Sequence, residues 1–189
     1  MSEAVIHDPL RPRAGVFLDR DGTIIEDTGF IRRVEDVHLL PGAVDGLRAL
    51  QSAGFVLVVV SNQSGLARGI MAERELNAVH GRFENLLRES GITVRECLYC
   101  PNHPNGAVEK YRRDCADRKG APGMILKAAH RHGIDLPGSW MIGDREGDLR
   151  AGRACGMRTI RIGQPGPGEP AADFSADNLW EASRIILGG

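Results

Sequence analysis

The sequence predicts an α/β protein built on a doubly wound, mostly parallel sheet. Two observations indicate this fold class. Apolar runs of strand length alternate with amphipathic helical segments, and the run FVLVVV (55–60) is continuously apolar, as expected of a strand buried on both faces. With 189 residues, 42% of them hydrophobic, the chain is long enough for one domain with a substantial core. We expect that domain at 14–189, after a flexible leader at 1–13.

Each expected element follows from a local pattern. The apolar run AGVFL (14–18) is typical of a first strand, and the segment 43–54 has apolar residues at helical spacing before a terminal glycine. Residues 72–90 place their apolar side chains on one helical face. A weaker strand pattern at 94–99 precedes a loop that runs to about residue 120. The remaining expected elements are a helix at 123–132, a strand at 139–143, a helix at 146–155, a strand at 159–163, a Gly/Pro-rich turn at 164–170 and a helix at 177–187.

The overall composition argues against several classes of protein. A net charge of −1 gives no general reason to expect a nucleic-acid partner. The chain has no run of about 18 apolar residues, so we expect no membrane span and no membrane partner. The N-terminal stretch lacks the apolar centre of a signal peptide, so we expect a cytoplasmic protein. We also expect a monomer.

Chemically capable side chains come directly after three of the expected strands. Asp19 and Asp21 follow the first strand, Ser61-Asn62-Gln63 (61–63) follow the second, and Asp144 and then Asp148 follow the strand at 139–143. In parallel sheets, ligands bind beyond the carboxyl ends of the strands. We therefore expect these side chains to converge on one site.

The convergence predicts a magnesium-assisted phosphoryl transfer. Carboxylates such as Asp19 and Asp144 are the hard oxygen ligands that Mg²⁺ prefers. Asp19 would attack phosphorus and form an aspartyl-phosphate, while Asp21 would protonate the leaving alcohol and later activate the hydrolytic water. Ser61 and Lys119 would bind the transferring phosphoryl oxygens, where negative charge must be stabilised. These four residues, Asp19, Asp21, Ser61 and Lys119, are the predicted catalytic set.

The same residues resemble the four signature motifs of the haloacid dehalogenase phosphatase superfamily. The motifs DRDGT (19–23), Ser61, Lys119 and GDREGD (143–148) occur in the expected order. The resemblance implies a Rossmann-like fold of the haloacid dehalogenase type. It also implies that Asp19, the Asp21 carbonyl and Asp144 bind Mg²⁺, with Asp148 adjacent to these ligands.

The spacing of the motifs leaves no room for a cap domain over the site. Only 41 residues separate Asp19 from Ser61, and they already contain a loop and a helix. The span from Ser61 to Lys119 holds one helix, one strand and a loop. We therefore expect an open site whose specificity comes from loops, including a cysteine-containing loop at about 100–119.

Three stretches narrow the resemblance to one subgroup. LDRDGTI, SNQSGLARG (61–69) and DRKGAPGM (117–124) are similar to the subgroup of heptose bisphosphate phosphatases and histidinol-phosphate phosphatases. This implies a small phosphorylated sugar as substrate and hydrolysis of the C7 phosphate of D-glycero-D-manno-heptose 1,7-bisphosphate, in the supply of heptose for lipopolysaccharide. The alternative is a histidinol-phosphate phosphatase or a broader sugar-phosphate phosphatase.

The subgroup also implies which residues contact the substrate. Arg118 matches an arginine that grasps the distal part of the substrate, and a planar guanidinium suits a second phosphate. The implied substrate-binding residues are Asp27, Thr28, Gly29, Phe30, Ser61, Asn62, Gln63, Ser64, Arg118 and Lys119.

The cysteine loop departs from the family pattern. The family often has a zinc site of the form Cys-x-His followed by Cys-x-Cys, and this chain has Cys100, Asn102, Cys115 and Asp117 at those positions. His103 lies one place from the expected histidine, so the candidate zinc ligands are Cys100, His103, Cys115 and Asp117, with Cys97 as a further candidate. A closed zinc site needs four well-placed ligands, which makes Zn²⁺ a doubtful second cofactor.

Two other classes of function remain as alternatives. Receiver domains also pair an aspartate nucleophile with Mg²⁺ and a lysine, but they lack the acid/base that Asp21 supplies here. A nucleic-acid module built on the cysteine loop would have an irregular ligand set and a near-neutral charge. Both alternatives are weaker than the phosphatase.

Overall fold

The computed structural model describes residues 13–166 and 168–188, so most of the predicted leader (1–12) lies outside the described residues. The predicted leader also included Arg13, which is the first residue of β1. The strands are β1 (Arg13–Leu18), β2 (Val56–Asn62), β3 (Glu96–Cys100), β4 (Ile134–Gly143), β5 (Arg158–Ile162) and β6 (Phe174–Ala176). The helices are α1 (Ala43–Ser52), α2 (Glu73–Glu89), α3 (Gly123–His132), α4 (Glu146–Ala154) and α5 (Leu179–Leu187), with 3₁₀ turns η1 (Val34–Asp36) and η2 (Glu109–Tyr111).

The strands form one sheet in the order β3-β2-β1-β4-β5-β6. Every pairing among the described strands is parallel, which confirms the predicted doubly wound sheet. The strand order reverses at β1, where Leu18 lies beside Val59 of β2 on one side and Ile142 of β4 on the other. Ligands of open α/β sheets bind at the carboxyl ends of the strands at such a reversal. The fold therefore places a crevice just beyond Leu18.

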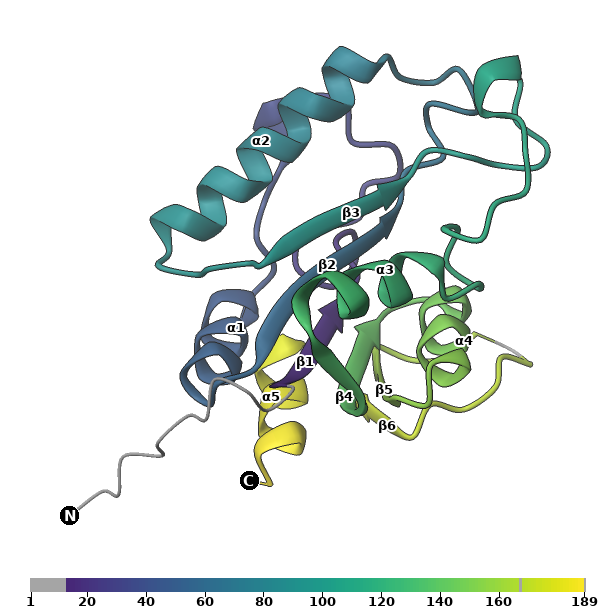
Figure 1. The fold of residues 1–189 in the computed structure, drawn as a ribbon. Helices are drawn as coiled ribbons and strands as arrows, with labels where there is room; N and C mark the ends of the chain where they lie inside the picture. The colour runs from purple at the N-terminus through teal and green to yellow at the C-terminus, as the bar shows by residue number, and fades with distance from the viewer. Residues whose placement is uncertain (1–12, 167, 189) are drawn as a thin grey trace.

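Helices cover both faces of the sheet, with α1, α2 and α5 on one face and α3 and α4 on the other (Figure 1). Successive strand residues point to opposite faces, so Val16 and Leu18 pack in the first layer and Phe17 packs in the second. In β2, Val59 and Val60 divide between the two layers in the same way. This confirms the continuously apolar run as a strand buried on both faces.

Two features of the sheet differ from the sequence expectation. Strand β4 begins at Ile134 rather than at residue 139, and its register against β1 shifts between Ala14 and Val16. A proline and a glycine (137–138) interrupt the apolar pattern in between, which hid the early part of the strand. Strand β6 was missed because it has only three residues, two of them exposed, and so shows no periodicity.

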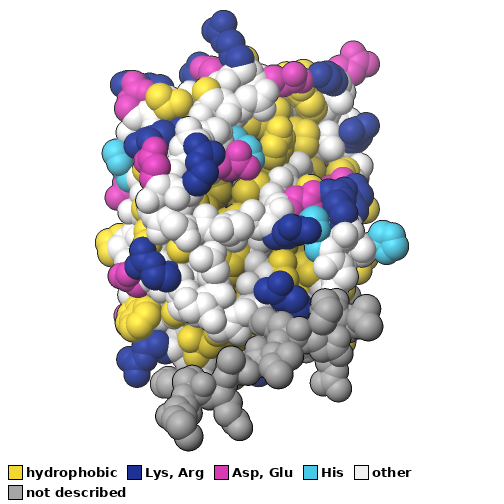
Figure 2. Space-filling view, turned by 60° about the vertical axis from the view of Figure 1, so that its left-hand side comes forward, with side chains coloured by type: hydrophobic (Ala, Val, Ile, Leu, Met, Phe, Trp, Pro, Cys, Tyr) yellow, Lys and Arg dark blue, Asp and Glu magenta, His cyan; other side chains and the backbone are white. Residues whose placement is uncertain are grey.

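No described segment forms a cap domain, as the spacing predicted. Between β1 and β2 the chain makes only a loop, η1 and α1, and between β3 and α3 it makes a loop with η2. On the face drawn in Figure 2, acidic and basic side chains are interspersed with hydrophobic ones. Among the described helices, none is both long and apolar enough to cross a membrane.

Candidate active site

A cavity of about 400 Å³ opens at the carboxyl edge of the sheet, beyond β1 and β2. It brings together the four predicted catalytic residues and all the predicted substrate-binding residues except Thr28. Its lining is Asp19, Asp21, Asp27, Gly29, Phe30, Ser61, Asn62, Gln63, Ser64, Arg68, Arg118, Lys119, Arg145, Gly147 and Asp148. Asp144 is not part of this lining, but its carboxylate lies within 4.8 Å of those of Asp19 and Asp148. Thr28 is exposed and does not line the cavity.

Asp19 occupies the first position after β1. Its backbone N–H donates to the Ile142 carbonyl at 2.9 Å, which fixes the end of β1 against β4. The side chain is buried, and its Oδ1 accepts from the Arg20 N–H at 2.7 Å and lies 2.5 Å from Lys119 Nζ. Burial raises the pKa of Asp19, and the Asp148 charge raises it further, while Lys119 opposes the shift. The charged carboxylate of Asp19 is therefore costly here unless cations surround it.

Lys119 supplies one of those cations. Its Nζ lies 2.5 Å from Asp19 Oδ1 and 2.7 Å from Asp148 Oδ1, with its side chain almost fully buried. Asn62, at the end of β2, holds the Lys119 backbone by accepting from its N–H at 2.8 Å and donating to its carbonyl at 3.3 Å. Burial lowers the pKa of Lys119, but the charges of Asp148 and Asp19 raise it above its ordinary value. The ammonium therefore stays charged.

Asp21 is held on both carboxylate oxygens. Arg20 donates from Nε to Oδ1 at 2.8 Å and from Nη2 to Oδ2 at 3.0 Å, and Gln63 Nε2 donates to Oδ2 at 2.7 Å. Gln63 also donates to Ser61 Oγ at 2.8 Å, which links the acid/base candidate to the predicted phosphate-binding serine. This network orients Asp21 toward the cavity that Asp19 lines.

The carboxylates of Asp19, Asp144 and Asp148 suit a hard divalent cation. Asp144 Oδ1 is buried and has no hydrogen-bond partner among the described residues, which is costly unless a cation is bound there. Asp148 is already engaged, because Oδ1 pairs with Lys119 and Oδ2 accepts from the Arg145 N–H at 3.1 Å. Of the three carboxylates, those of Asp19 and Asp144 are therefore best suited to bind Mg²⁺. The Asp21 carbonyl remains a ligand predicted from the sequence.

Gly22 makes room for this carboxylate group. It has φ +75°, and a Cβ built on it would lie 2.5 Å from Asp144 Oδ2. Any side chain at this position would combine backbone strain with a collision at the candidate metal ligand. The glycine of the DRDGT motif is thus required by close approach.

Three arginines stand around the cavity, of which only Arg118 was predicted. Arg118 donates from Nη1 to the Asn102 carbonyl at 3.0 Å, and Arg68 Nη2 lies 3.1 Å from His103 Nε2. Arg145 Nη2 pairs with Asp27 Oδ2 at 2.5 Å and so ties the loop after β4 to the predicted substrate loop. Arg68 and Arg145, like Arg20, each lie inside a motif on which the family resemblance rests. Their place in these motifs was the one feature of the sequence that could have marked them as site residues.

The cysteine loop brings together only part of the candidate zinc set. Cys100 Sγ and Cys115 Sγ lie 3.7 Å apart, but His103 Nε2 contacts Arg68, and Asp117 Oδ2 pairs with Lys127 Nζ at 2.5 Å. As placed, these residues do not make a four-ligand zinc site.

The suggestion that Cys97 joins the candidate zinc set is wrong. Cys97 packs in the layer under α1, α2 and α5, whereas Cys100 packs in the layer under α3 and α4. The two positions are three residues apart on β3, and an odd separation places side chains on opposite faces of a sheet.

Asp144→Asn should stabilise the protein in a chelating buffer, and more strongly as the pH rises. Burial raises the pKa of Asp144 from 3.8 to about 6, with the Asp19 charge adding to the shift. The folded state therefore binds the carboxyl proton of Asp144 more tightly than the unfolded state does. The stability that protonated Asp144 contributes to the folded state is lost between about pH 4 and pH 6. Urea unfolding should show an advantage for the variant that grows by about 2–3 kcal/mol over this interval. At pH 7, Mg²⁺ should make the unmodified chain more stable than Asp144→Asn. If the stability advantage of the variant in chelating buffer shrinks as the pH rises, Asp144 is not a buried carboxylate with a raised pKa.

Comparison with known proteins agrees with this geometry. A family model described as HAD-hydrolase-like matches residues 117–182, which include Lys119 and Asp144. The chain is 37% identical over 176 residues to the D-glycero-beta-D-manno-heptose-1,7-bisphosphate 7-phosphatase of Escherichia coli strain K12, covering 90% of this chain and 92% of that protein. It is 31% identical to the D-glycero-alpha-D-manno-heptose-1,7-bisphosphate 7-phosphatase of Photorhabdus laumondii, covering 90% and 94%.

A solved structure is similar over nearly the whole chain. It is the D,D-heptose 1,7-bisphosphate phosphatase of B. bronchiseptica complexed with magnesium and phosphate, with a TM-score of 0.79 and 30% identity. The match covers 93% of this chain and 98% of that chain.

Proposed function

The chain belongs to the HAD-like phosphatase family that includes the D-glycero-D-manno-heptose-1,7-bisphosphate 7-phosphatases, and from this premise we propose that it removes the C7 phosphate of D-glycero-D-manno-heptose 1,7-bisphosphate. The observation that carries the proposal is the buried Asp19–Lys119–Asp148 arrangement facing a cavity rimmed by arginines. In this arrangement Asp19 would be the nucleophile for the C7 phosphate, and the arginines would be the cations that bind the C1 phosphate.

In the proposed mechanism Asp19 attacks phosphorus as the P–O7 bond breaks. The product is an aspartyl-phosphate, and Asp21 gives its proton to the departing O7 oxygen. Asp21 then takes a proton from water as the water attacks phosphorus, which releases inorganic phosphate and regenerates the Asp19 carboxylate. Arg20 and Gln63 keep the Asp21 carboxyl oriented through both steps.

Charge at the transferring phosphoryl group is balanced by groups at the carboxyl edge of the sheet. Lys119 and Ser61 would bind its oxygens, since both line the cavity beside Asp19. When bound by Asp19 and Asp144, Mg²⁺ supplies positive charge that offsets the repulsion between an anionic nucleophile and an anionic phosphate. Magnesium at this site is part of the proposal, and the hard oxygen donors support it.

We assign the C1 phosphate to two of the arginines that line the cavity. Arg118 and Arg68 both line the cavity, and their like charges act on one another, since Arg68 lowers the pKa of Arg118 in addition to the larger effect of burial. Two guanidinium groups that line one cavity repel each other less when an anion lies between them. We therefore assign them to the phosphate that is not hydrolysed.

Arg118→Ala should lower kcat/KM for the bisphosphate by about 10- to 100-fold, because a charge-assisted contact of this kind contributes roughly 1.5–3 kcal/mol. The same variant should change kcat/KM for a monophosphate such as heptose 7-phosphate by much less, since that substrate has no C1 phosphate. Steady-state kinetics with both substrates would measure this. Arg113→Ala is the matched control, because Arg113 is an exposed arginine of the same loop outside the cavity lining. Equal losses on both substrates would remove Arg118 from the C1 phosphate.

The function itself is tested by comparing substrates at saturating Mg²⁺. We expect one anomer of heptose 1,7-bisphosphate to exceed histidinol phosphate and simple phosphomonoesters in kcat/KM. Both anomers must be assayed, because similar proteins act on each of them according to their names. A preference for histidinol phosphate would replace the heptose assignment while leaving the phosphatase chemistry in place.

A further inference from the structure

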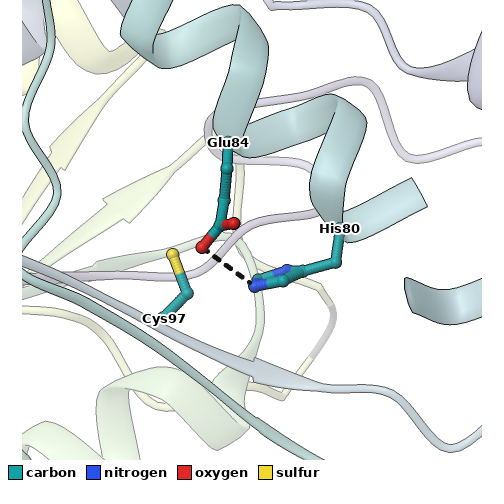
Figure 3. Close-up of side chains that lie close together, drawn as sticks. All are labelled: His80, Glu84 and Cys97. Carbon is teal, nitrogen blue, oxygen red and sulfur yellow. Dashed lines mark ion pairs between the residues drawn. The ribbon is translucent and has the colours of Figure 1, made fainter. Parts of the chain in front are cut away.

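Three metal-binding side chains meet outside the active site. His80 and Glu84 project from α2 and Cys97 projects from β3 toward the same point (Figure 3). His80 Nε2 lies 3.3 Å from Glu84 Oε1, and one ligand atom from each of the three residues lies within 4.8 Å of the others. Among the described residues, this is the only such group besides the active-site carboxylates.

The fold explains why these residues meet. His80 and Glu84 are four positions apart on α2, so their side chains lie on the same helical face. Cys97 lies on the face of the sheet that α2 covers, together with Phe83 and Leu87 of the helix. Strand β3 is an edge strand that pairs only with β2 among the described strands. The cluster therefore spans the contact between a helix and the edge of the sheet.

We propose that His80, Glu84 and Cys97 form a site for one Zn²⁺ ion or a similar divalent transition metal, unrelated to the cysteine loop. The donors are an imidazole nitrogen, a carboxylate oxygen and a thiolate sulfur, a set typical of zinc and unsuited to Mg²⁺. In a tetrahedral zinc site with bonds of about 2.0–2.3 Å, ligand atoms are roughly 3.3–3.8 Å apart. His80 Nε2 and Glu84 Oε1 already have such a separation, and the ligand atoms of all three residues lie within 4.8 Å of one another. Water would fill the fourth position.

Protonation and charge are compatible with such a site. Burial, together with the charge of Arg20, lowers the pKa of His80 by more than Glu84 raises it, so the ring is neutral near pH 7 and offers a lone pair. Burial raises the pKa of the Cys97 thiol to about 12, so the metal must displace a proton on binding. The charge of Arg20 acts unfavourably on a cation here, but the Glu84 carboxylate and the Cys97 thiolate together balance a divalent ion.

The bound metal would fasten α2 to β3. Anything that binds only the folded state stabilises it by mass action, so Zn²⁺ should raise the Tm of the full chain. This effect should be seen in saturating Mg²⁺, which occupies the carboxylates of the active site. It does not depend on which phosphate ester the enzyme hydrolyses.

The test is a titration of the full chain, reduced and stripped of metals, with Co²⁺ as a spectroscopic substitute for Zn²⁺ in saturating Mg²⁺. We expect a near-ultraviolet sulfur-to-cobalt charge-transfer band, which carboxylates cannot produce, and its loss on addition of one equivalent of Zn²⁺. Cys97→Ser should abolish the band, and His80→Gln should weaken cobalt binding by more than about tenfold, since even loss of an outer partner of a metal ligand costs that much.

Cys115→Ser is the matched control, because Cys115 and Cys100 form the pair of neighbouring thiols in the cysteine loop, away from Cys97. It should retain both the band and the affinity. Absence of the band in the unmodified chain would overturn the proposal. So would a band that persists in Cys97→Ser, or one that disappears in Cys115→Ser, since either result would place the cobalt-bound thiolate on another cysteine.

Discussion

Asp19→Asn should abolish phosphate release, with a loss of about 10⁴-fold or more in kcat, while the protein remains folded. The asparagine amide cannot attack phosphorus. Among the described carboxylates at the cavity, only Asp19 directly follows β1, where its Oδ1 contacts Lys119 Nζ and the Arg20 N–H. Folding should survive because burial disfavours the charged form of Asp19, whose pKa is raised. The unfolding temperature in a chelating buffer should match or exceed that of the unmodified chain.

The control for this variant is Asp45→Asn, which removes an exposed carboxylate of α1 that does not line the cavity. It should retain full activity. Mass spectrometry of acid-quenched turnover should detect a phosphorylated chain in the control and none in Asp19→Asn. Substantial activity in Asp19→Asn would mean that water attacks phosphorus directly and that no aspartyl-phosphate forms.

Lys119→Met should cost both activity and stability. Its Nζ is the cation between Asp19 and Asp148, and its side chain is only 3% exposed, so solvent cannot replace it. Removing one partner of a buried ion pair typically costs about 3–5 kcal/mol, because the remaining charges are left without compensation. We expect a loss of that size in urea unfolding, together with a fall in kcat of at least about 10²-fold from lost stabilisation of the phosphoryl oxygens.

The matched control is Lys127→Met, since Lys127 also pairs with an aspartate but is 56% exposed. A surface pair of this kind contributes at most about 1 kcal/mol, so this variant should be nearly neutral. Adding Asp148→Asn to Lys119→Met should restore part of the lost stability by removing one uncompensated charge. If the double variant is less stable than Lys119→Met, the buried cation is not there to balance Asp148.

The topology of the site was predictable because the carboxyl ends of parallel strands share one edge of the sheet. Asp19 and Asp144 directly follow β1 and β4, and Ser61 is the next-to-last residue of β2, which runs two residues beyond its apolar run. The apolar run of each strand is visible in the sequence, and the structure places all three residues at that edge. Strands without such a run, β6 and the start of β4, could not be found in this way.

The partners of the site residues were harder to predict. Asn62 and Gln63 were expected to contact substrate, but their side chains also hold the Lys119 backbone and the Asp21 carboxylate. Such contacts join residues more than 40 positions apart, and no local pattern encodes them. Arg20 was missed for a related reason, since an arginine between two acids is usually a solvated residue, whereas this one is 2% exposed and bonded to Asp21.

The measurement that tests the central claim most directly is a ³¹P NMR time course on heptose 1,7-bisphosphate with Mg²⁺. The assignment of Asp19 and Asp21 to the hydrolysed phosphate, and of Arg68 and Arg118 to the retained one, predicts heptose 1-phosphate and inorganic phosphate in equal amounts. Accumulation of heptose 7-phosphate, or no turnover of either anomer while other phosphomonoesters are hydrolysed, would contradict it.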